Sequence, residues 1–299
     1  MHEAYILPGP LALSRSTVDR AADRRADSAW LDSLWADDDA TRVLLVGDGT
    51  VPVDGDGLRF VPPSAAPDGD RLLLGVDDGV NYVAVRVDGR PEGGATLRDV
   101  GAVLGDRDAG LAVHAIALAN WHANHQFCPR CGGPTRSTDG GHIRVCEVDG
   151  SQHFPRTDPA VIVLLVDEKD RCLLGRSAAW PGQRFSTLAG FVEPGETPEH
   201  AVVRELYEEV GVRVTSCTYA GAQPWPFPSS LMLGYYGTAA GEEPTPDGEE
   251  IAEARWFSRD ELTEAMERGD VLPPSGISIA RKLVEGWYGR PLPVDAPWR

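Results

Sequence analysis

The sequence predicts an α+β protein made of three regions, and three observations support this division. Residues 1–120 alternate short apolar runs with Gly, Asp and Pro turns, which is typical of a β-rich domain. Residues 121–156 contain cysteines at the spacing of a small metal-binding ribbon. Residues 157–299 mix apolar, β-branched runs with helical segments, which predicts a mixed sheet flanked by helices. We therefore expect three successive domains with these boundaries.

In the first region, strands are expected where apolar runs stand between turns, at Thr41–Val46, 71–74 and 82–87. A helix should follow at 111–125, because Ala, Leu and Trp occur there without Gly or Pro. His122 and His125 lie on this helix, and we assign them to packing or to the surface in preference to metal ligation.

The third region begins with the strongest strand signal in the chain. The run 160–166 is continuously apolar and rich in β-branched residues, which indicates a strand buried on both faces. A turn at 167–170 should connect it to a hairpin partner at 171–175. The remaining strands and helices are expected at 188–192, 201–210, 212–219, 231–238 and 277–288.

Three acidic side chains share one face of the helix expected at 201–210. Glu205, Glu208 and Glu209 are separated by the offsets that make helical side chains neighbours. Like charges held this close repel each other unless water solvates them or a divalent cation draws them together. The acidic face is therefore either a solvated helix surface or a site for a divalent cation. Glu196, in the Gly/Pro loop before the helix, is placed to pair with Arg204.

The stretch from Gly190 to Val212 resembles the Nudix box, GX5EX7REUXEEXGU, where U is a bulky aliphatic residue. Every fixed position of that pattern is matched. The matching residues are Gly190, Glu196, Arg204, Glu205, Leu206, Glu208, Glu209, Gly211 and Val212.

The resemblance to Nudix hydrolases implies an α/β/α sandwich and hydrolysis of a pyrophosphate bond. It implies that Glu205, Glu208 and Glu209 bind Mg²⁺ or Mn²⁺, and that the backbone at Ala189 adds a ligand. Glu250 matches the family position for a further acidic ligand or base, with Glu253 as the second choice. Arg204 and Glu196 complete the expected catalytic set.

The segment 222–232, AQPWPFPSSLM, interleaves prolines with aromatic residues. Proline suits neither a helix interior nor a central strand, so we expect a rigid, extended loop. Such a loop presents Trp225 and Phe227 either to the core or to a flat ligand.

This loop resembles the SQPWPFPxS signature of the NADH pyrophosphatase branch of the Nudix family, with Ala222 in place of the first Ser. The resemblance implies a dinucleotide pocket, whereas core packing is the alternative for the aromatic residues. The residues that match substrate-binding positions of the family are Phe191, Phe154, Gln223, Trp225, Phe227, Ser230, Met232 and Ala280.

The cysteines Cys128, Cys131 and Cys146 have the spacing of a structural zinc ribbon. The fourth position of a second Cys-x-x-Cys falls on Asp149, and His153 and His142 are the nearby alternatives. The family usually carries four cysteines here. We expect bound zinc with Asp149 (or His153) as the fourth ligand, against the alternative of a metal-free ribbon held by hydrophobic packing.

The composition restricts the class of protein and its partners. A net charge of −18, from 46 acidic against 28 basic residues, argues against general affinity for nucleic-acid backbones. The basic residues near the ribbon that offer contacts to RNA are Arg130, Arg136, Arg144 and Arg156. The sequence shows no apolar run of membrane-spanning length and no secretory signal. Cys172 and Cys217 are expected as buried thiols, which suits a reducing cytoplasm.

Together the resemblances imply that the protein splits NAD(H) into nicotinamide mononucleotide and AMP, and that it removes NAD caps from RNA. They also imply a homodimer. Two alternatives remain: an ADP-ribose or dinucleoside polyphosphate hydrolase, and a Nudix module that senses nucleotides without cutting them. The intact acidic cluster argues against the second, and the 223–230 motif argues against the first.

Overall fold

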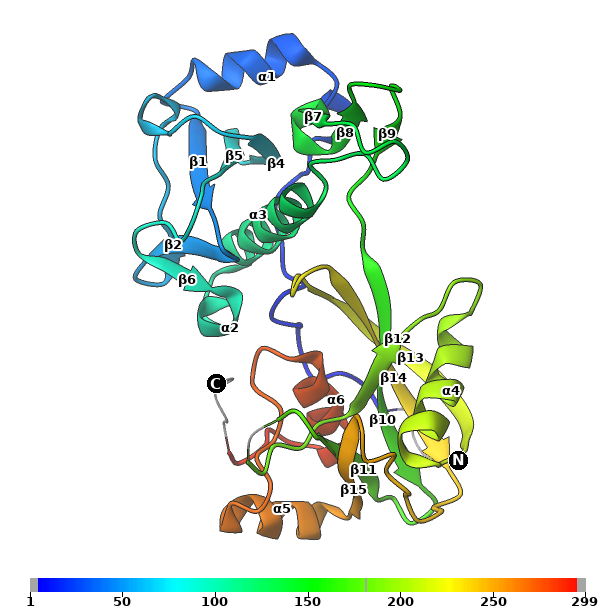
Figure 1. Ribbon diagram of the computed structural model, residues 1–299. Helices are drawn as coiled ribbons and strands as arrows, with labels where there is room; N and C mark the ends of the chain where they lie inside the picture. The colour runs from blue at the N-terminus through cyan, green and yellow to red at the C-terminus, as the bar shows by residue number, and fades with distance from the viewer. Residues whose placement is uncertain (1–4, 181, 295–299) are drawn as a thin grey trace. The chain divides into compact units, whose positions relative to one another are not determined.

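The computed structural model describes residues 5–180 and 182–294 (Figure 1). The chain divides into two compact units, which we describe separately. One unit comprises Leu13–Thr157 and Pro224–Ser229. The other comprises the described residues of Met1–Ala12, Asp158–Gln223 and Ser230–Arg299. The predicted α+β class is confirmed, and the first unit is rich in strands as expected.

The N-terminal part of the first unit contains two small sheets. In one sheet the strand order is β1-β5-β4, with β1 parallel and β4 antiparallel to β5. In the other sheet the order is β3-β2-β6. The strands are β1 (Thr41–Val46), β2 (Thr50–Asp54), β3 (Gly57–Leu58), β4 (Arg71–Asp77), β5 (Val80–Arg86) and β6 (Gly94–Thr96), and the helices are α1 (Ser28–Trp35), α2 (Leu97–Val100) and α3 (Asp106–Asn124).

Helix α3 contacts the strands of both sheets and is buried along most of its length. It begins at Asp106, five residues before the expected start at 111, because Asp106 and Asp108 are stabilised near the positive end of the helix dipole. Its His122 is fully buried: Nε2 lies 2.8 Å from the Gly141 carbonyl oxygen and Nδ1 lies 2.7 Å from Nη1 of Arg144. His122 therefore has the packing role that we expected.

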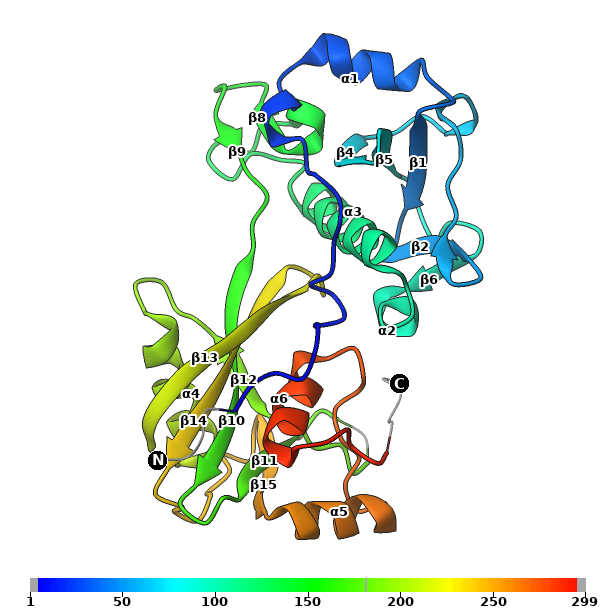
Figure 2. The same cartoon turned by 180° about the vertical axis from the view of Figure 1, so that it is seen from behind.

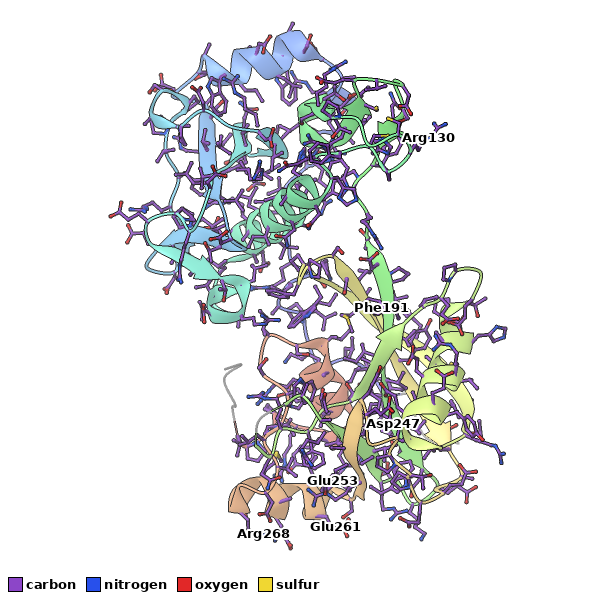
Figure 3. All side chains as sticks on the ribbon, viewed as in Figure 1. Arg130, Phe191, Asp247, Glu253, Glu261 and Arg268 are labelled. Atoms are coloured by element: carbon purple, nitrogen blue, oxygen red, sulfur yellow. The ribbon has the colours of Figure 1, made fainter. Side chains whose placement is uncertain are left out.

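The ribbon follows α3 as an antiparallel sheet of β7 (Thr135–Thr138), β8 (Ile143–Cys146) and β9 (Gln152–His153). Arg144 is buried here and donates hydrogen bonds to Thr135 as well as contacting His122. The expectation that Arg144 contacts RNA is therefore wrong, because its guanidinium is used inside the fold. Arg136 is exposed. Arg130 is exposed as well (Figure 3).

Three histidines of this unit are held neutral by burial. Burial, together with the charges of neighbouring arginines, lowers the pKa of His114, of His122 and of His142, the last to about 4. The unfolded chain takes up protons below the ordinary histidine pKa of about 6.5, whereas the folded protein does not. The free energy of unfolding therefore falls as the pH drops from about 6.5 towards 4.

We expect His142→Gln to make this acid sensitivity shallower. Glutamine keeps a donor for the Leu73 carbonyl oxygen, which lies 3.0 Å from His142 Nε2, but has no proton to gain. Between pH 7 and pH 4.5 the wild type should lose roughly 1–2 kcal/mol more than the variant in urea unfolding. His200→Gln, at an exposed position, is the control. An equal loss in wild type and His142→Gln would contradict the assignment.

The second unit is built on one mixed sheet of order β13-β14-β10-β11-β15, with β12 paired to β10. Helix α4 covers one face, and α5 and α6 cover the other (Figures 1 and 2). This arrangement is the predicted α/β/α sandwich. The elements are β10 (Asp158–Asp167), β11 (Cys172–Ser177), β12 (Leu188–Phe191), α4 (Pro198–Val210), β13 (Val214–Trp225), β14 (Ser230–Ala239), β15 (Ile251–Phe257), α5 (Arg259–Arg268) and α6 (Ile279–Tyr288).

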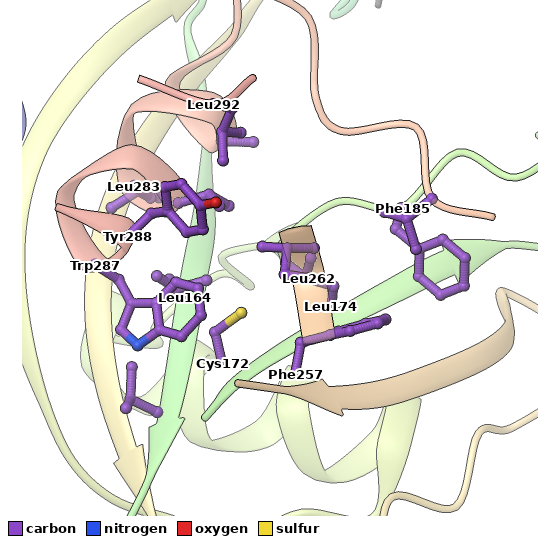
Figure 4. Close-up of a cluster of buried hydrophobic side chains, with 14 of the residues drawn as sticks. Leu164, Cys172, Leu174, Phe185, Phe257, Leu262, Leu283, Trp287, Tyr288 and Leu292 are labelled. Atoms are coloured by element: carbon purple, nitrogen blue, oxygen red, sulfur yellow. The ribbon is translucent and has the colours of Figure 1, made fainter. Parts of the chain in front are cut away.

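Strand β10 lies inside the sheet and divides its side chains between two hydrophobic clusters. Ile162, Leu164 and Val166 pack with α5 and α6, while the alternate residues Val161, Val163 and Leu165 pack with α4. This confirms the predicted strand buried on both faces. Figure 4 shows the α5/α6 side, where Leu164 lies with Leu283 and Trp287 of α6.

The two thiols outside the ribbon differ in burial. Cys172 on β11 is completely buried, as expected. Cys217 is only half-buried, because β13 is the edge strand of the sheet. The expectation of a buried thiol is therefore wrong for Cys217.

The loop within the proline-rich segment is shorter than the expected range of 222–232, because strands extend into it from both sides. Strand β13 continues through Pro224 to Trp225, and β14 begins at Ser230. An edge strand tolerates proline because one side of its backbone has no neighbouring strand that needs its N–H groups.

In the residues that the structure describes, no helix combines the length and the apolar character needed to cross a bilayer.

Candidate functional site

The acidic helix α4 is fixed at both ends by local sequence. At its start, Thr197 accepts a hydrogen bond from the His200 amide, and Pro198 occupies the first turn, where its missing N–H costs nothing. At its end, Gly211 takes a left-handed conformation with φ 69°. The glycine-rich loop and the two caps therefore determine where the acidic face begins and ends.

Arg204 is the centre of a network of carboxylates. Its Nε and Nη2 donate to the two carboxylate oxygens of Glu196 at 2.9 and 2.8 Å, in a two-point fork. Its Nη1 donates to Glu205 at 2.9 Å and to Glu208 at 3.1 Å. Nη2 also reaches the Phe191 carbonyl oxygen at 2.9 Å. The Glu196–Arg204 pairing expected from the sequence is present, and it lowers the pKa of Glu196 to about 2.

Gly190 on β12 leaves the space that the Glu205 carboxylate occupies. A Cβ at this position would lie 1.9 Å from the carboxylate carbon of Glu205, far inside any allowed contact. Only glycine lets the Glu205 carboxylate lie against the β12 backbone. Burial raises the pKa of Glu205, against the opposing effect of Arg204.

Glu209 is the most unusual acid of the helix. It is 5 % exposed, and its Oε2 has no hydrogen-bond partner among the described residues. Burial raises its pKa to about 8, and the charges of Glu205, Glu250, Asp247 and Glu208 add to the effect. A buried carboxylate that has an oxygen without a hydrogen-bond partner and that is surrounded by negative charge is costly unless a cation is supplied.

The segment before β15 brings two further acids towards Glu209. Glu250, which we predicted, contributes to the raised pKa of both Glu205 and Glu209. Asp247, which we did not predict, organises the turn by accepting from the backbone amides of residues 249–251, and its own amide donates to the Glu209 carbonyl oxygen at 3.0 Å. Its only sequence signal is the Pro-Asp-Gly turn.

Glu253 differs from Glu250 because its carboxylate forms ion pairs with arginines of the sheet. Its carboxylate lies 2.9 Å from Arg255 and 3.5 Å from Arg176, so it is already paired within the sheet. Figure 3 shows Asp247 and Glu253 at separate places in this unit. The preference for Glu250 over Glu253 is consistent with this difference.

The residues present fit a divalent cation of the hard type. Carboxylates from α4 and from the segment before β15 supply oxygen donors, and the unpartnered Oε2 of Glu209 lies among them. Ala189, whose backbone was predicted to add a ligand, lies on β12 next to Gly190 and pairs with Ile162 of β10. Among the described residues, Arg204 is the basic side chain that bonds to the carboxylates of this helix.

The substrate-binding residues predicted in the second unit differ in exposure. Phe191 is 60 % exposed at the end of β12. Gln223 is fully buried, and its Nε2 donates to the Ile277 carbonyl oxygen at 3.0 Å. Ala280 is 1 % exposed in the α5/α6 cluster, and Met232 packs against that cluster. Ser230 is half-buried at the first position of β14.

The predicted residues in the first unit are aromatic. Phe154 is 61 % exposed where the ribbon ends. Trp225 and Phe227 contact each other edge to face, with ring centroids 4.9 Å apart. Arg98 lies over the Phe227 ring at 4.0 Å.

The ribbon gathers the four residues predicted to bind zinc. Single donor atoms of Cys128, Cys131, Cys146 and Asp149 all lie within 4.8 Å of one another. His153, the alternative, is connected to the group through Ser151, whose Oγ lies 3.2 Å from His153 Nε2 and 2.5 Å from Asp149. Three sulfurs and one oxygen in a tight group are a donor set that suits structural zinc, which takes four protein ligands.

Comparison with protein families accounts for most of the chain. Residues 156–274 match the NUDIX domain, and residues 123–154 match the NADH pyrophosphatase zinc ribbon domain. Residues 29–121 match the NADH pyrophosphatase-like rudimentary NUDIX domain.

The chain is similar over most of its length to NudC proteins of mycobacteria, and over a shorter part to a human protein. The NAD-capped RNA hydrolase NudC of Mycobacterium bovis (strain BCG / Pasteur 1173P2) is 39% identical over 298 residues, covering 92% of this chain and 94% of that protein. NudC of Mycobacterium tuberculosis (strain ATCC 25618 / H37Rv) gives the same identity and coverage, 39%, 92% and 94%. The NAD-capped RNA hydrolase NUDT12 of Homo sapiens is 40% identical over 197 residues, covering 62% of this chain and 42% of that protein. The chain therefore belongs to the Nudix hydrolases, in the family of NADH pyrophosphatases and NAD-capped RNA hydrolases that carry a zinc ribbon.

Proposed function

We propose that this chain hydrolyses the pyrophosphate bond of NAD(H), giving nicotinamide mononucleotide and AMP, with Mg²⁺ or Mn²⁺ held by Glu205, Glu208, Glu209 and Glu250. The backbone carbonyl at Ala189 completes the proposed ligand set. The observation that carries this proposal is the buried, unpartnered Oε2 of Glu209 beside other carboxylates. Such a group is stable when a cation is bound and unfavourable otherwise.

The side chains divide the work between holding charge and fixing geometry. A bound divalent cation neutralises phosphate oxygens and makes a bound water more acidic. Glu205 and Glu209 supply oxygens from the half-buried and buried part of the helix, and Glu208 supplies them from the exposed part. Arg204 has no lone pair to offer a cation, so we assign it to orienting Glu205 and Glu208. Glu196 fixes the guanidinium of Arg204 in turn.

We also propose that the chain removes NAD caps from RNA 5′ ends. The relatives named above are NAD-capped RNA hydrolases, and the cap contains the same bond as free NAD. The exposed Arg130 and Arg136 are the ribbon contacts that we assign to the RNA backbone.

The cellular setting is proposed on the same basis. We place the protein in the cytoplasm as a homodimer. Each chain should consist of three domains, at 1–120, 121–156 and 157–299, with one structural zinc ion in the ribbon. The five cysteines are all free thiols, which suits a reducing compartment.

A parallel substrate assay tests the proposal. The purified protein is incubated with Mg²⁺ or Mn²⁺ and with NADH, NAD⁺, NAD-capped RNA, ADP-ribose or a dinucleoside polyphosphate, and initial rates are measured. We expect the highest kcat/KM for a nicotinamide substrate, with nicotinamide mononucleotide as a product. A higher value for ADP-ribose or for the dinucleoside polyphosphate would favour the alternative hydrolase. Nucleotide binding without cleavage of any substrate would favour the sensing module.

Ser230 should contribute to selection of the nicotinamide end. We expect Ser230→Ala to lower kcat/KM more for NADH than for ADP-ribose, because ADP-ribose has no nicotinamide ring to place. The difference should correspond to roughly 1–3 kcal/mol of transition-state binding free energy. Ser229→Ala is the matched control, since Ser229 stands at the variable position of the motif. Equal losses on both substrates would mean that Ser230 does not read the nicotinamide.

A further inference from the structure

The tip of the proline-rich loop belongs to the first unit. Residues Pro224–Ser229 pack with Leu13–Thr157, although the chain on either side of them continues into β13 and β14 of the other unit. The loop that matches the family signature for the substrate is therefore held by residues more than a hundred positions earlier in the sequence. Asn120 and Arg98 of the first unit contact this loop.

The first of these side chains is Asn120 on α3. Its Nδ2 donates to the Pro226 carbonyl oxygen and to the Pro228 carbonyl oxygen, each at 3.1 Å. Both partners are acceptors, so the atom that faces them must be the amide nitrogen. One NH₂ group thus satisfies two carbonyl groups of the loop with its two hydrogens.

The loop needs such an external donor because of its prolines. Pro224, Pro226 and Pro228 have no backbone N–H, so the segment cannot close a regular ladder or turn with its own amides. The backbone hydrogen bond described within it runs from the Phe227 amide to the Trp225 carbonyl oxygen, at 2.7 Å. The carbonyl groups of Pro226 and Pro228 are left to Asn120.

The second side chain is Arg98 on α2. Its guanidinium lies 4.0 Å from the centroid of the Phe227 ring and 6.0 Å from that of Trp225. Trp225 and Phe227 in turn contact each other edge to face. A planar guanidinium over an aromatic face attracts it electrostatically and limits the rotation of the ring.

We propose that Asn120 and Arg98 are positioning residues for substrate selection: Asn120 fixes the backbone of the loop and Arg98 fixes its aromatic pair. This inference rests on the proposed function, in which the loop reads the nicotinamide end of NAD(H). It assigns a function in catalysis to the rudimentary NUDIX region, which carries none of the proposed metal ligands. Neither side chain is placed on the substrate itself.

Substitutions that conserve size separate positioning from packing. Asn120→Asp keeps the volume of the side chain but turns an acceptor towards two carbonyl oxygens, whereas Asn120→Ala removes the whole amide group together with its volume. Asn124→Ala is the control for the helix, because Asn124 lies one turn further along α3 and donates to the Asn120 backbone. Arg98→Leu is compared with Arg71→Leu, which removes an arginine stacked 3.9 Å from the Trp35 ring in the same unit.

The first readout is the ratio of kcat/KM for NADH to kcat/KM for ADP-ribose. We expect this ratio to fall by roughly 5- to 30-fold in Asn120→Asp, somewhat less in Asn120→Ala and Arg98→Leu, and to stay at the wild-type value in both controls. Arg98→Lys should recover part of the loss, because it restores the charge without the planar stack. A packing role alone would leave Asn120→Asp close to wild type, and that result would overturn the inference.

The second readout does not depend on activity. Hydrogen exchange of a peptide covering 225–232 should become faster in Asn120→Asp and Asn120→Ala but not in Asn124→Ala. Unchanged exchange would overturn the inference even if catalysis changed. If wild-type protein does not cleave NADH, the proposed function fails, whereas the exchange result still decides whether Asn120 holds the loop.

Discussion

Glu209→Gln should abolish most of the activity without unfolding the protein. Glutamine has nearly the same shape as glutamate, but it removes the negative charge that we assign to the divalent cation. We expect kcat for NADH to fall by at least about two orders of magnitude. The fold should survive because the buried carboxylate is itself unfavourable: burial and the neighbouring acids raise its pKa to about 8.

The melting temperature in the absence of metal gives an independent check. Since neutral glutamine suits a buried position better than a carboxylate, the metal-free variant should melt no earlier than the metal-free wild type. The rise in melting temperature on adding Mg²⁺ or Mn²⁺ should be smaller in the variant, because less binding energy is available to the folded state. Glu264→Gln, in the exposed pair with Arg268 on α5, is the control. A variant that keeps most of its activity at saturating Mn²⁺ would show that Glu209 is not a required ligand.

Cys131→Ser should release zinc and destabilise the first unit, Leu13–Thr157 with Pro224–Ser229. Cys131 Sγ lies 3.4 Å from Cys146 Sγ, and both belong to the group with donor atoms within 4.8 Å of one another. A closed zinc site contributes its binding energy to folding, which in small zinc domains reaches about 10 kcal/mol or more. We therefore expect the zinc content to fall from about one ion per chain to near zero and the melting temperature to drop.

Two matched variants sharpen the test of the zinc site. Cys217→Ser removes a thiol from β13, outside the ribbon, and should leave the zinc content unchanged. Asp149→Ala should release zinc whereas His153→Gln should retain it, because Asp149 and not His153 lies in the group of four. Freshly purified wild-type protein without zinc would contradict the proposal as a whole.

The local arrangement of the acidic helix was predictable from the sequence. The spacing of Glu205, Glu208 and Glu209 determines that they share a face, because helical geometry depends only on residues within one turn. The helix ends before Gly211 as expected, but it begins at Pro198, three residues before the expected start at 201, because Thr197 caps it and Pro198 fits its first turn. The Cys-x-x-Cys turn of the ribbon is similarly short-range, and the matches to the Nudix box and the 223–230 signature identified the family.

The contacts that complete the site were decided by tertiary structure. Nothing in the sequence pattern places Asp247 beside Glu209. The pattern includes Gly190, but it does not show that the Glu205 carboxylate fills the place of a Cβ there. The same is true of Asn120, which holds a loop 106 and 108 residues away. These contacts depend on how β12, β15 and α3 pack against distant parts of the chain. Packing is a property of complementary surfaces and not of local periodicity, so only the folded chain determines it.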